Sequence, residues 1–136
     1  MLRFKVDTVR PQGRGASGVA GINLAKDASA IYFNAVDAES VVVTAANNSS
    51  AIAGTDPGSA KVRELSEFPA KGRATGGVRA QKFIRNEDQL YFAWVGSGDA
   101  LAATSDGKPI ELNLELAKRD ASGSKIDSAI GGLGSK

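Results

Sequence analysis

Residues 13–19, which read Gly-Arg-Gly-Ala-Ser-Gly-Val, return 59 positions later as residues 72–78, Gly-Arg-Ala-Thr-Gly-Gly-Val. The same offset aligns several aromatic and apolar positions: Tyr32-Phe33 with Tyr91-Phe92, and Val36 with Val95. Two separate patches that agree at one offset, with uncommon aromatic residues among them, indicate an internal repeat. The 136-residue chain then divides into blade-like units at 1–59 and 60–119 and a remnant or tail at 120–136.

The apolar pattern within the units is typical of β-structure. Short runs that are partly β-branched or aromatic predict strands at residues 31–36, 41–44, 90–95 and 101–104. Leucines at 112, 114 and 116 alternate with polar residues and favour a strand, with a helix over 111–118 as the alternative. Several short strands per unit at a fixed period predict an all-β, propeller-like array of blades. The Ser/Gly-rich residues 120–136 are expected to form a frayed tail.

Composition excludes several classes of site. The chain has no His and no Cys, which rules out His-based triads, Cys nucleophiles, typical zinc sites and disulfides. No pair of carboxylates stands out as a metal or acid–base site, so we expect no catalytic residue, metal or cofactor in this chain. No apolar run approaches the ~20 residues of a membrane span, and the first residues lack a signal-peptide pattern. A cytoplasmic protein with no membrane contact is therefore expected.

Charge is distributed along the chain in blocks. The net charge is only +2, yet residues 1–26 carry +4 and residues 57–86 carry +5, whereas residues 27–56 and 87–127 carry −4 each. A surface that serves solubility alone intersperses its charges more evenly. Two basic blocks that follow the repeat indicate positive charge directed at one partner.

Both Gly/Arg stretches lie within these basic blocks and predict phosphate-binding loops. Glycine lets the backbone approach a ligand closely, and the Arg guanidinium matches the geometry of a phosphate. Arg14 and Arg73 are the strongest candidates because the repeat makes them equivalent. The full set of candidate phosphate-binding residues is Arg10, Arg14, Lys71, Arg73, Arg79, Lys82 and Arg85. The competing interpretation is a solvated turn whose basic side chains bind nothing.

Two other interpretations concern enzymes. Residues 13–18 also spell G-x-G-x-x-G, and a dinucleotide site would need a strand before this stretch and a helix after it. A nucleotide enzyme is therefore a further hypothesis, which a cofactor titration would test. Tyr32 and Tyr91 occupy equivalent positions and are expected to be structural rather than catalytic. Trp94 aligns with Ala35, so core packing is its expected role.

Residues 9–19 and 67–78 resemble the blade signatures of the C-terminal domain of bacterial type IIA topoisomerase A subunits. This family comprises the A subunit of DNA gyrase and its topoisomerase IV counterpart, and the resemblance covers about residues 2–118. It implies a β-pinwheel, a ring of blades whose basic rim binds and bends duplex DNA for an ATP-dependent strand-passing enzyme. The nucleophilic Tyr, the metal-binding residues and the ATP site would then lie in other domains or in the ATPase B subunit.

The chain departs from the family pattern in two ways. The gyrase hallmark Gln-Arg-Arg-Gly-Gly-Lys-Gly is matched by residues 12–18 only at Gln12, Arg14, Gly15 and Gly18. Two blades cannot close a ring, so the chain is expected to be a fragment of a larger ring. Its open strand edges are expected to favour self-association, or else to leave a strained, partly open array. The alternative function is a protein-interaction propeller module without DNA binding.

Overall fold

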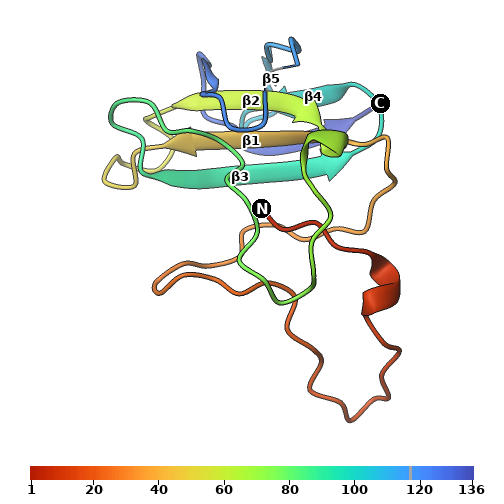
Figure 1. Ribbon diagram of the computed structural model, residues 1–136. Coiled ribbons are helices and arrows are strands. Elements are labelled where there is room, and N and C mark those ends of the chain that lie inside the picture. Colours follow the sequence, from red (N-terminus) through yellow and green to blue (C-terminus); the bar gives the residue numbers. More distant parts are fainter. Residues whose placement is uncertain (117) are drawn as a thin grey trace.

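The computed structural model describes residues 1–116 and 118–136 and is all-β, as the sequence predicts (Figure 1). The described residues contain no α-helix, only two single 3₁₀ turns, η1 (Val6–Thr8) and η2 (Leu65–Glu67). No helix in this part of the chain is long and apolar enough to cross a membrane.

The larger sheet has four strands in the order β3-β1-β2-β6. These strands are β1 (Val41–Asn47), β2 (Ser59–Glu64), β3 (Gln89–Gly96) and β6 (Ser124–Lys125). All pairs are antiparallel, and β1 lies between β2 and β3, with Val43 opposite Val62 on one side and Trp94 on the other. A register shift between Ala45 and Ala46 marks an irregularity in the β1–β3 pair.

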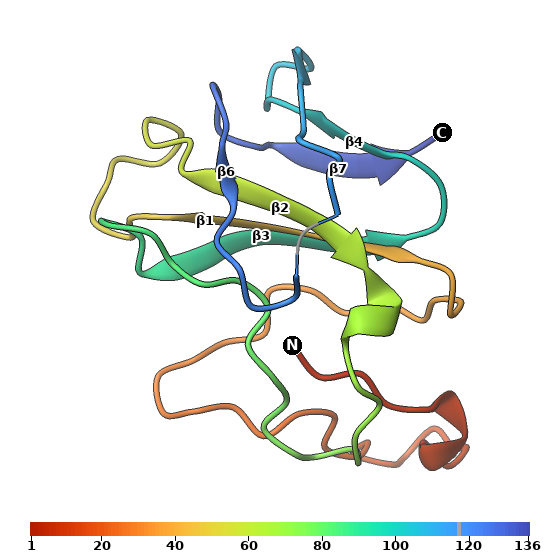
Figure 2. The same ribbon diagram turned by 45° about the horizontal axis from the view of Figure 1, so that its top comes forward.

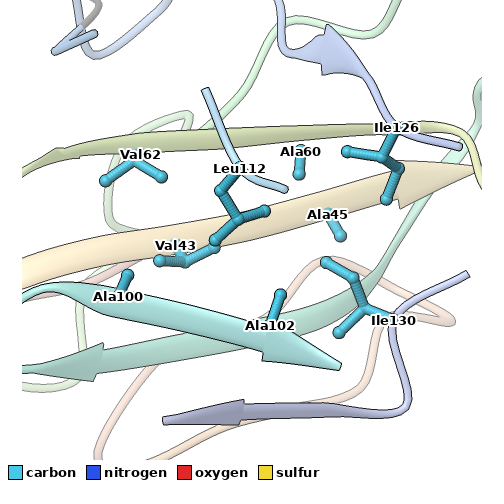
Figure 3. Packing of buried hydrophobic residues seen from close by; sticks show 9 residues of the cluster. All are labelled: Val43, Ala45, Ala60, Val62, Ala100, Ala102, Leu112, Ile126 and Ile130. Atoms are coloured by element: carbon cyan, nitrogen blue, oxygen red, sulfur yellow. The ribbon is translucent and has the colours of Figure 1, made fainter. Parts of the chain in front are cut away.

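A smaller sheet covers one face of the larger one. It has the order β5-β4-β7 and is built from β4 (Ala100–Ala103), β5 (Pro109–Ile110) and β7 (Gly132–Ser135). Figure 3 shows the apolar core formed by residues of both sheets together with Leu112, Ile126 and Ile130. The core members are Val43, Ala45, Ala60, Val62, Ala100, Ala102, Leu112, Ile126 and Ile130.

Irregular segments cover the other face of the larger sheet. Figures 1 and 2 show the N-terminal segment and the stretch after β2 on the side away from β4 and β5. A second apolar cluster forms there around Val42, Leu65 and Phe68, with Met1 and Val78 packed against it. Because successive strand residues point to opposite faces, Val42 and Val43 belong to different clusters. Burial on both faces explains why β1 reads as a continuous apolar run rather than an alternating one.

The strands predicted at 41–44, 90–95 and 101–104 are confirmed as β1, β3 and β4, with ends that differ by a few residues. Strand β2 was not predicted from the sequence. Its alternation of Ala60, Lys61, Val62 and Arg63 places two charged side chains on a face that is expected to be exposed, whereas the structure buries them.

Two predicted strands are wrong. Residues 31–36 have no strand partner, and the side chains of Tyr32 and Asn34 instead donate hydrogen bonds to the Val95 carbonyl. Residues 112–116 form neither a strand nor a helix, because only Leu112 reaches the core while Leu114 and Leu116 are exposed. The alternative helix over 111–118 also includes residue 117, which lies outside the described residues.

The expectation of a frayed tail over residues 120–136 is also wrong. Strand β6 pairs with β2, and β7 pairs with β4. Ile126 and Ile130 are buried in the apolar core. The small residues of this segment are used for close packing, since a Cβ on Gly123 or Gly131 would meet neighbouring atoms at less than normal contact distance.

The backbone carries repeated features at the offset found in the sequence. The turns η1 and η2 begin 59 residues apart and have closely similar flanking dihedral angles. Gly18 and Gly77 both have positive φ, 82° and 74°, and so do Asp27 and Asn86, at 64° and 74°. Glycine, Asn and Asp are the residues that tolerate this conformation best. The limits of the units at 1–59, 60–119 and 120–136 remain predictions.

The pair Gly18 and Gly77 leads to a test of loop packing. We expect Gly18→Ala to lower the free energy of unfolding by about 1–2 kcal/mol, the cost of a left-handed residue. Gly77→Ala should cost clearly more, because its Cβ would also collide with the Met1 carbonyl, whereas nothing lies near Gly18. Denaturant unfolding of both variants measures the difference. Equal losses would contradict the contact between Gly77 and the N-terminus.

A second test concerns the C-terminal segment. Ile130→Ala should destabilise the chain by about 2–5 kcal/mol, because this side chain is 5% exposed within the apolar core. Ile52→Ala is the matched control, since Ile52 is 79% exposed and should change stability by less than about 0.5 kcal/mol. Denaturant titration measures both, and a neutral Ile130→Ala would support a frayed tail instead.

Candidate nucleic-acid interface

The second Gly/Arg loop, residues 72–78, lies beside residues 20–23, which follow the first loop. The Ala74 amide donates a 2.7 Å hydrogen bond to the Gly21 carbonyl, and the Asn23 amide donates a 3.0 Å bond to the Thr75 carbonyl. Further along the same segments, the Lys71 amide donates to the Arg3 carbonyl at 2.9 Å. In Figure 1 both loops lie on the side of the four-stranded sheet that carries the N-terminus. The second basic stretch therefore packs against the segment that follows the first loop, and both loops lie on the same side of the sheet.

The structure leaves nearly all the predicted basic residues free at the surface. The exposed residues are Arg10, Arg14, Lys71, Arg79, Lys82 and Arg85. None of the seven candidates is ion-paired among the described residues, where Lys108 and Asp106 form the single salt bridge, at 3.0 Å. Basic side chains without acidic partners remain available to an external anion.

Arg73 differs from the other six. It is half-buried, and its Nη1 donates a hydrogen bond to the Ala20 carbonyl of the neighbouring loop. Its Nε is buried without an acceptor. Arg14, its counterpart in the repeat, is fully at the surface. Equivalence in sequence therefore does not give equivalent environments, and Arg73 also connects the second loop to the segment that follows the first.

The C-terminal segment bonds to the backbone of two other candidates, Arg79 and Lys82. Arg119 Nη1 donates to the Arg79 carbonyl at 3.1 Å, and the Lys82 amide donates to the Ala121 carbonyl at 3.1 Å. Lys82 and Ser122 also form a parallel bridge. These bonds use the backbone of Arg79 and Lys82, so both side chains remain free.

A buried chain of hydrogen bonds connects this region to the sheet. Arg63 Nη2 donates to Thr44 Oγ1, which donates to Gln81 Oε1, at 2.6 and 2.7 Å. Gln81 Nε2 then donates to Ser59 Oγ at 2.9 Å, and Ser59 Oγ donates to Glu87. These residues were not predicted from the sequence. The only available signal was the placement of polar residues at alternate positions of β2.

Two buried cations lie on the same face of β2. Lys61 is 3% exposed and Arg63 is 0% exposed. Burial lowers the pKa of Lys61 to about 8, with a further contribution from the charge of Arg63. Burial also lowers the pKa of Arg63 to about 10, with the charge of Arg119 as the second cause. Positive charge is thus concentrated in the interior, on β2, as well as at the surface, on the exposed candidate residues.

The residues considered for other chemistry have structural contacts. The Tyr32 hydroxyl donates to the Val95 carbonyl, and the Tyr91 hydroxyl donates to the Pro57 carbonyl, both at 3.1 Å. Trp94 packs against the apolar core. Residues 13–18 are neither preceded by a strand nor followed by a helix, which contradicts the dinucleotide-binding alternative. No group of His, Cys, Asp or Glu residues that could hold a metal occurs in the described part of the chain.

Comparison with known proteins agrees with this architecture. The family described as DNA gyrase C-terminal domain, beta-propeller, matches residues 1–37 and 51–88. The DNA gyrase A subunit of Streptomyces coelicolor is 32% identical over 117 residues, covering 83% of this chain and 13% of the relative. The Salmonella typhimurium DNA gyrase A subunit is 37% identical over 93 residues, covering 68% of this chain and 10% of the relative. The chain thus spans a small part of these relatives.

The fold likewise matches a solved structure, the C-terminal domain of DNA topoisomerase IV. The TM-score is 0.66 at 17% sequence identity, and the match covers 96% of this chain and 42% of that one. At this identity the match supports the fold alone, and it confirms the expected propeller-like architecture. The residues matched by the family make up more than half of the chain, so this protein belongs to the DNA gyrase C-terminal domain family of β-propellers.

Proposed function

We propose that this chain binds duplex DNA through the basic residues of its two Gly/Arg loops and of the segment that follows the second loop. The observation that carries the proposal is that both loops lie on one side of the sheet, with none of the seven candidate bases ion-paired among the described residues. Phosphate contacts by Arg and Lys release counterions from the duplex, which supplies affinity without sequence preference. Bending of the duplex over the loops would supply any preference indirectly.

The wider setting follows from the relatives. We propose that the chain is part of the A subunit of an ATP-dependent type II topoisomerase and acts in the cytoplasm with the ATPase B subunit. The active site would lie outside this chain. Self-association remains an expectation. It is supported by the outer edge of β3, which pairs only with β1 among the described strands. Ile31 and Phe33 are also exposed, on either side of Tyr32, which bonds to Val95 of β3.

The first test is the salt dependence of binding to a random-sequence duplex of a few tens of base pairs. The affinity should fall steeply between about 50 and 200 mM salt. The double variant Arg10→Ala/Arg14→Ala should reduce the slope of log K against log salt by about 1.8, because each lost phosphate contact contributes about 0.9. Lys108→Ala removes one exposed base outside the loops and should leave the slope unchanged.

The outcomes separate the two functional classes. An unchanged slope in the double variant, with the fold intact by circular dichroism, would overturn the assignment of Arg10 and Arg14. Absence of binding at low salt by the unmodified chain would favour the protein-interaction module.

A second test separates Arg14 from Arg73. Arg73→Ala should lower the free energy of unfolding by about 1–3 kcal/mol, because it removes a charge-assisted hydrogen bond to the neighbouring loop. Arg14→Ala should stay within about 0.5 kcal/mol, as expected of an exposed side chain. Thermal or denaturant unfolding without DNA measures both. Equal stabilities would show that the contact between Arg73 and Ala20 contributes nothing.

A further inference from the structure

Two equivalent turns, at residues 25–28 and 84–87, lie 59 positions apart. In each turn the amide of the fourth residue donates to the carbonyl of the first at 3.1 Å. The third residue has a positive φ in both turns, 64° and 74°, which is a feature of type II turns. The second residue is basic, Lys26 or Arg85, and both side chains are exposed. The repeat thus holds one basic residue at the same position of the same turn in each copy.

An exposed apolar side chain precedes each of these basic residues by two positions. Leu24 is 40% exposed, and its counterpart Phe83 is 39% exposed. Elsewhere the second copy covers what the first exposes, since Val6 is 77% exposed and its counterpart Leu65 only 3%. Among the described residues, Leu24 and Phe83 are the one pair of large apolar side chains that is exposed in both copies. Their exposure therefore belongs to the repeated turn and not to a neighbour that one copy lacks.

Backbone hydrogen bonds hold the residues next to both side chains. The Asn23 amide donates to the Thr75 carbonyl at 3.0 Å, and the Lys82 amide donates to the Ala121 carbonyl at 3.1 Å. In Figures 1 and 2 the first turn, in orange, and the second, in green, both extend to the left of the view, away from η1. Side chains that are held before binding lose less conformational freedom when a ligand binds.

The surroundings of Phe83 match the chemistry of a duplex. Lys82 and Arg85 lie on either side of it in the sequence, and neither is ion-paired within the described part of the chain. The two carboxylates that follow, Glu87 and Asp88, accept hydrogen bonds within the chain. Basic side chains bind phosphates, and Leu and Phe are among the apolar side chains that proteins insert between base steps from the minor groove.

We propose that Phe83 and Leu24 enter the minor groove of the bound duplex and partly unstack a base step. The basic residues of the same turns, Arg85 and Lys26, then bind the adjacent phosphates. This inference rests on the proposed function and extends it to three residues outside the candidate set, Leu24, Lys26 and Phe83. Unstacking requires least energy at a mismatch or at a flexible pyrimidine–purine step, so such sites should be preferred. The second turn should contribute more, because Phe83 has basic residues on both sides whereas Asp27 follows Lys26.

The test compares binding to two duplexes of a few tens of base pairs, one fully paired and one with a single central mismatch. The unmodified chain should bind the mismatched duplex about tenfold more tightly, since a mismatched step is easier to unstack. Phe83→Ala should remove this preference and leave the slope of log K against log salt unchanged, because no phosphate contact is lost. Phe33→Ala is the matched control: Phe33 is 84% exposed, lies outside both turns and should keep the preference.

The phosphate contact of the first turn has its own measurement. Lys26→Ala should lower the salt slope by about 0.9, the contribution of one phosphate contact. An unchanged slope would remove Lys26 from the interface and overturn the contact of the first turn.

The outcomes separate this inference from the proposed function. Salt-dependent binding with the mismatch preference intact in Phe83→Ala would overturn the inference and leave the proposed function standing. Absence of binding by the unmodified chain would overturn both. An equal loss of affinity for a single strand of the same length would show that Phe83 stacks on unpaired bases, which also overturns the minor-groove contact.

A competition measurement keeps the inference testable if Phe83→Ala does not fold. Distamycin, a small ligand that fills the minor groove of A·T-rich duplexes, should displace the unmodified chain from such a duplex. Undiminished binding at saturating distamycin would overturn the minor-groove contact.

Discussion

The β1–β2 pair has two faces to bury, and the rest of the structure follows from what covers each of them. Val43, Ala45, Ala60 and Val62 meet the smaller sheet, where strands cover strands and only apolar contacts are needed. On the opposite face the cover is irregular chain. Irregular chain lacks the regular hydrogen bonding of a sheet, so its buried polar groups need partners from other elements. The strands provide them through Thr44, Ser59 and Lys61.

The different covers of the two faces determine which basic residues are buried and which are exposed to a ligand. Lys61 donates to the Arg119 carbonyl and so connects the C-terminal segment to the sheet. Arg119 donates to the Arg79 carbonyl and so connects the same segment to the second basic block. Lys82 is held by its backbone amide and by Gln81 before it, so its ammonium is free. Interior cations thus stabilise the fold while surface cations remain unpaired. For the proposed binding of phosphates by charge, this separation matters more than the net charge of +2.

The repeat, the all-β class and the strands β1, β3 and β4 could be predicted from the sequence because they are recorded in local patterns. The strand β2 could not, since a pattern that alternates Lys and Arg with apolar residues normally indicates an exposed face. Residues 31–36 have the pattern of β3 but no strand to pair with, and pairing is not a local property. The packing of the C-terminal segment was equally unpredictable, because glycines that permit close packing have the same composition as glycines in a flexible tail.

The difference between Arg14 and Arg73 has the same origin as the difference between Gly18 and Gly77. In both pairs the backbone repeats, but only the second member has another part of the chain against it: Ala20 for Arg73 and Met1 for Gly77. A repeated motif therefore serves two purposes within one molecule. The copy that is covered contributes to packing against another part of the chain, and the copy that is exposed has no such contact. Sequence equivalence identifies such positions, and burial decides which of them can bind.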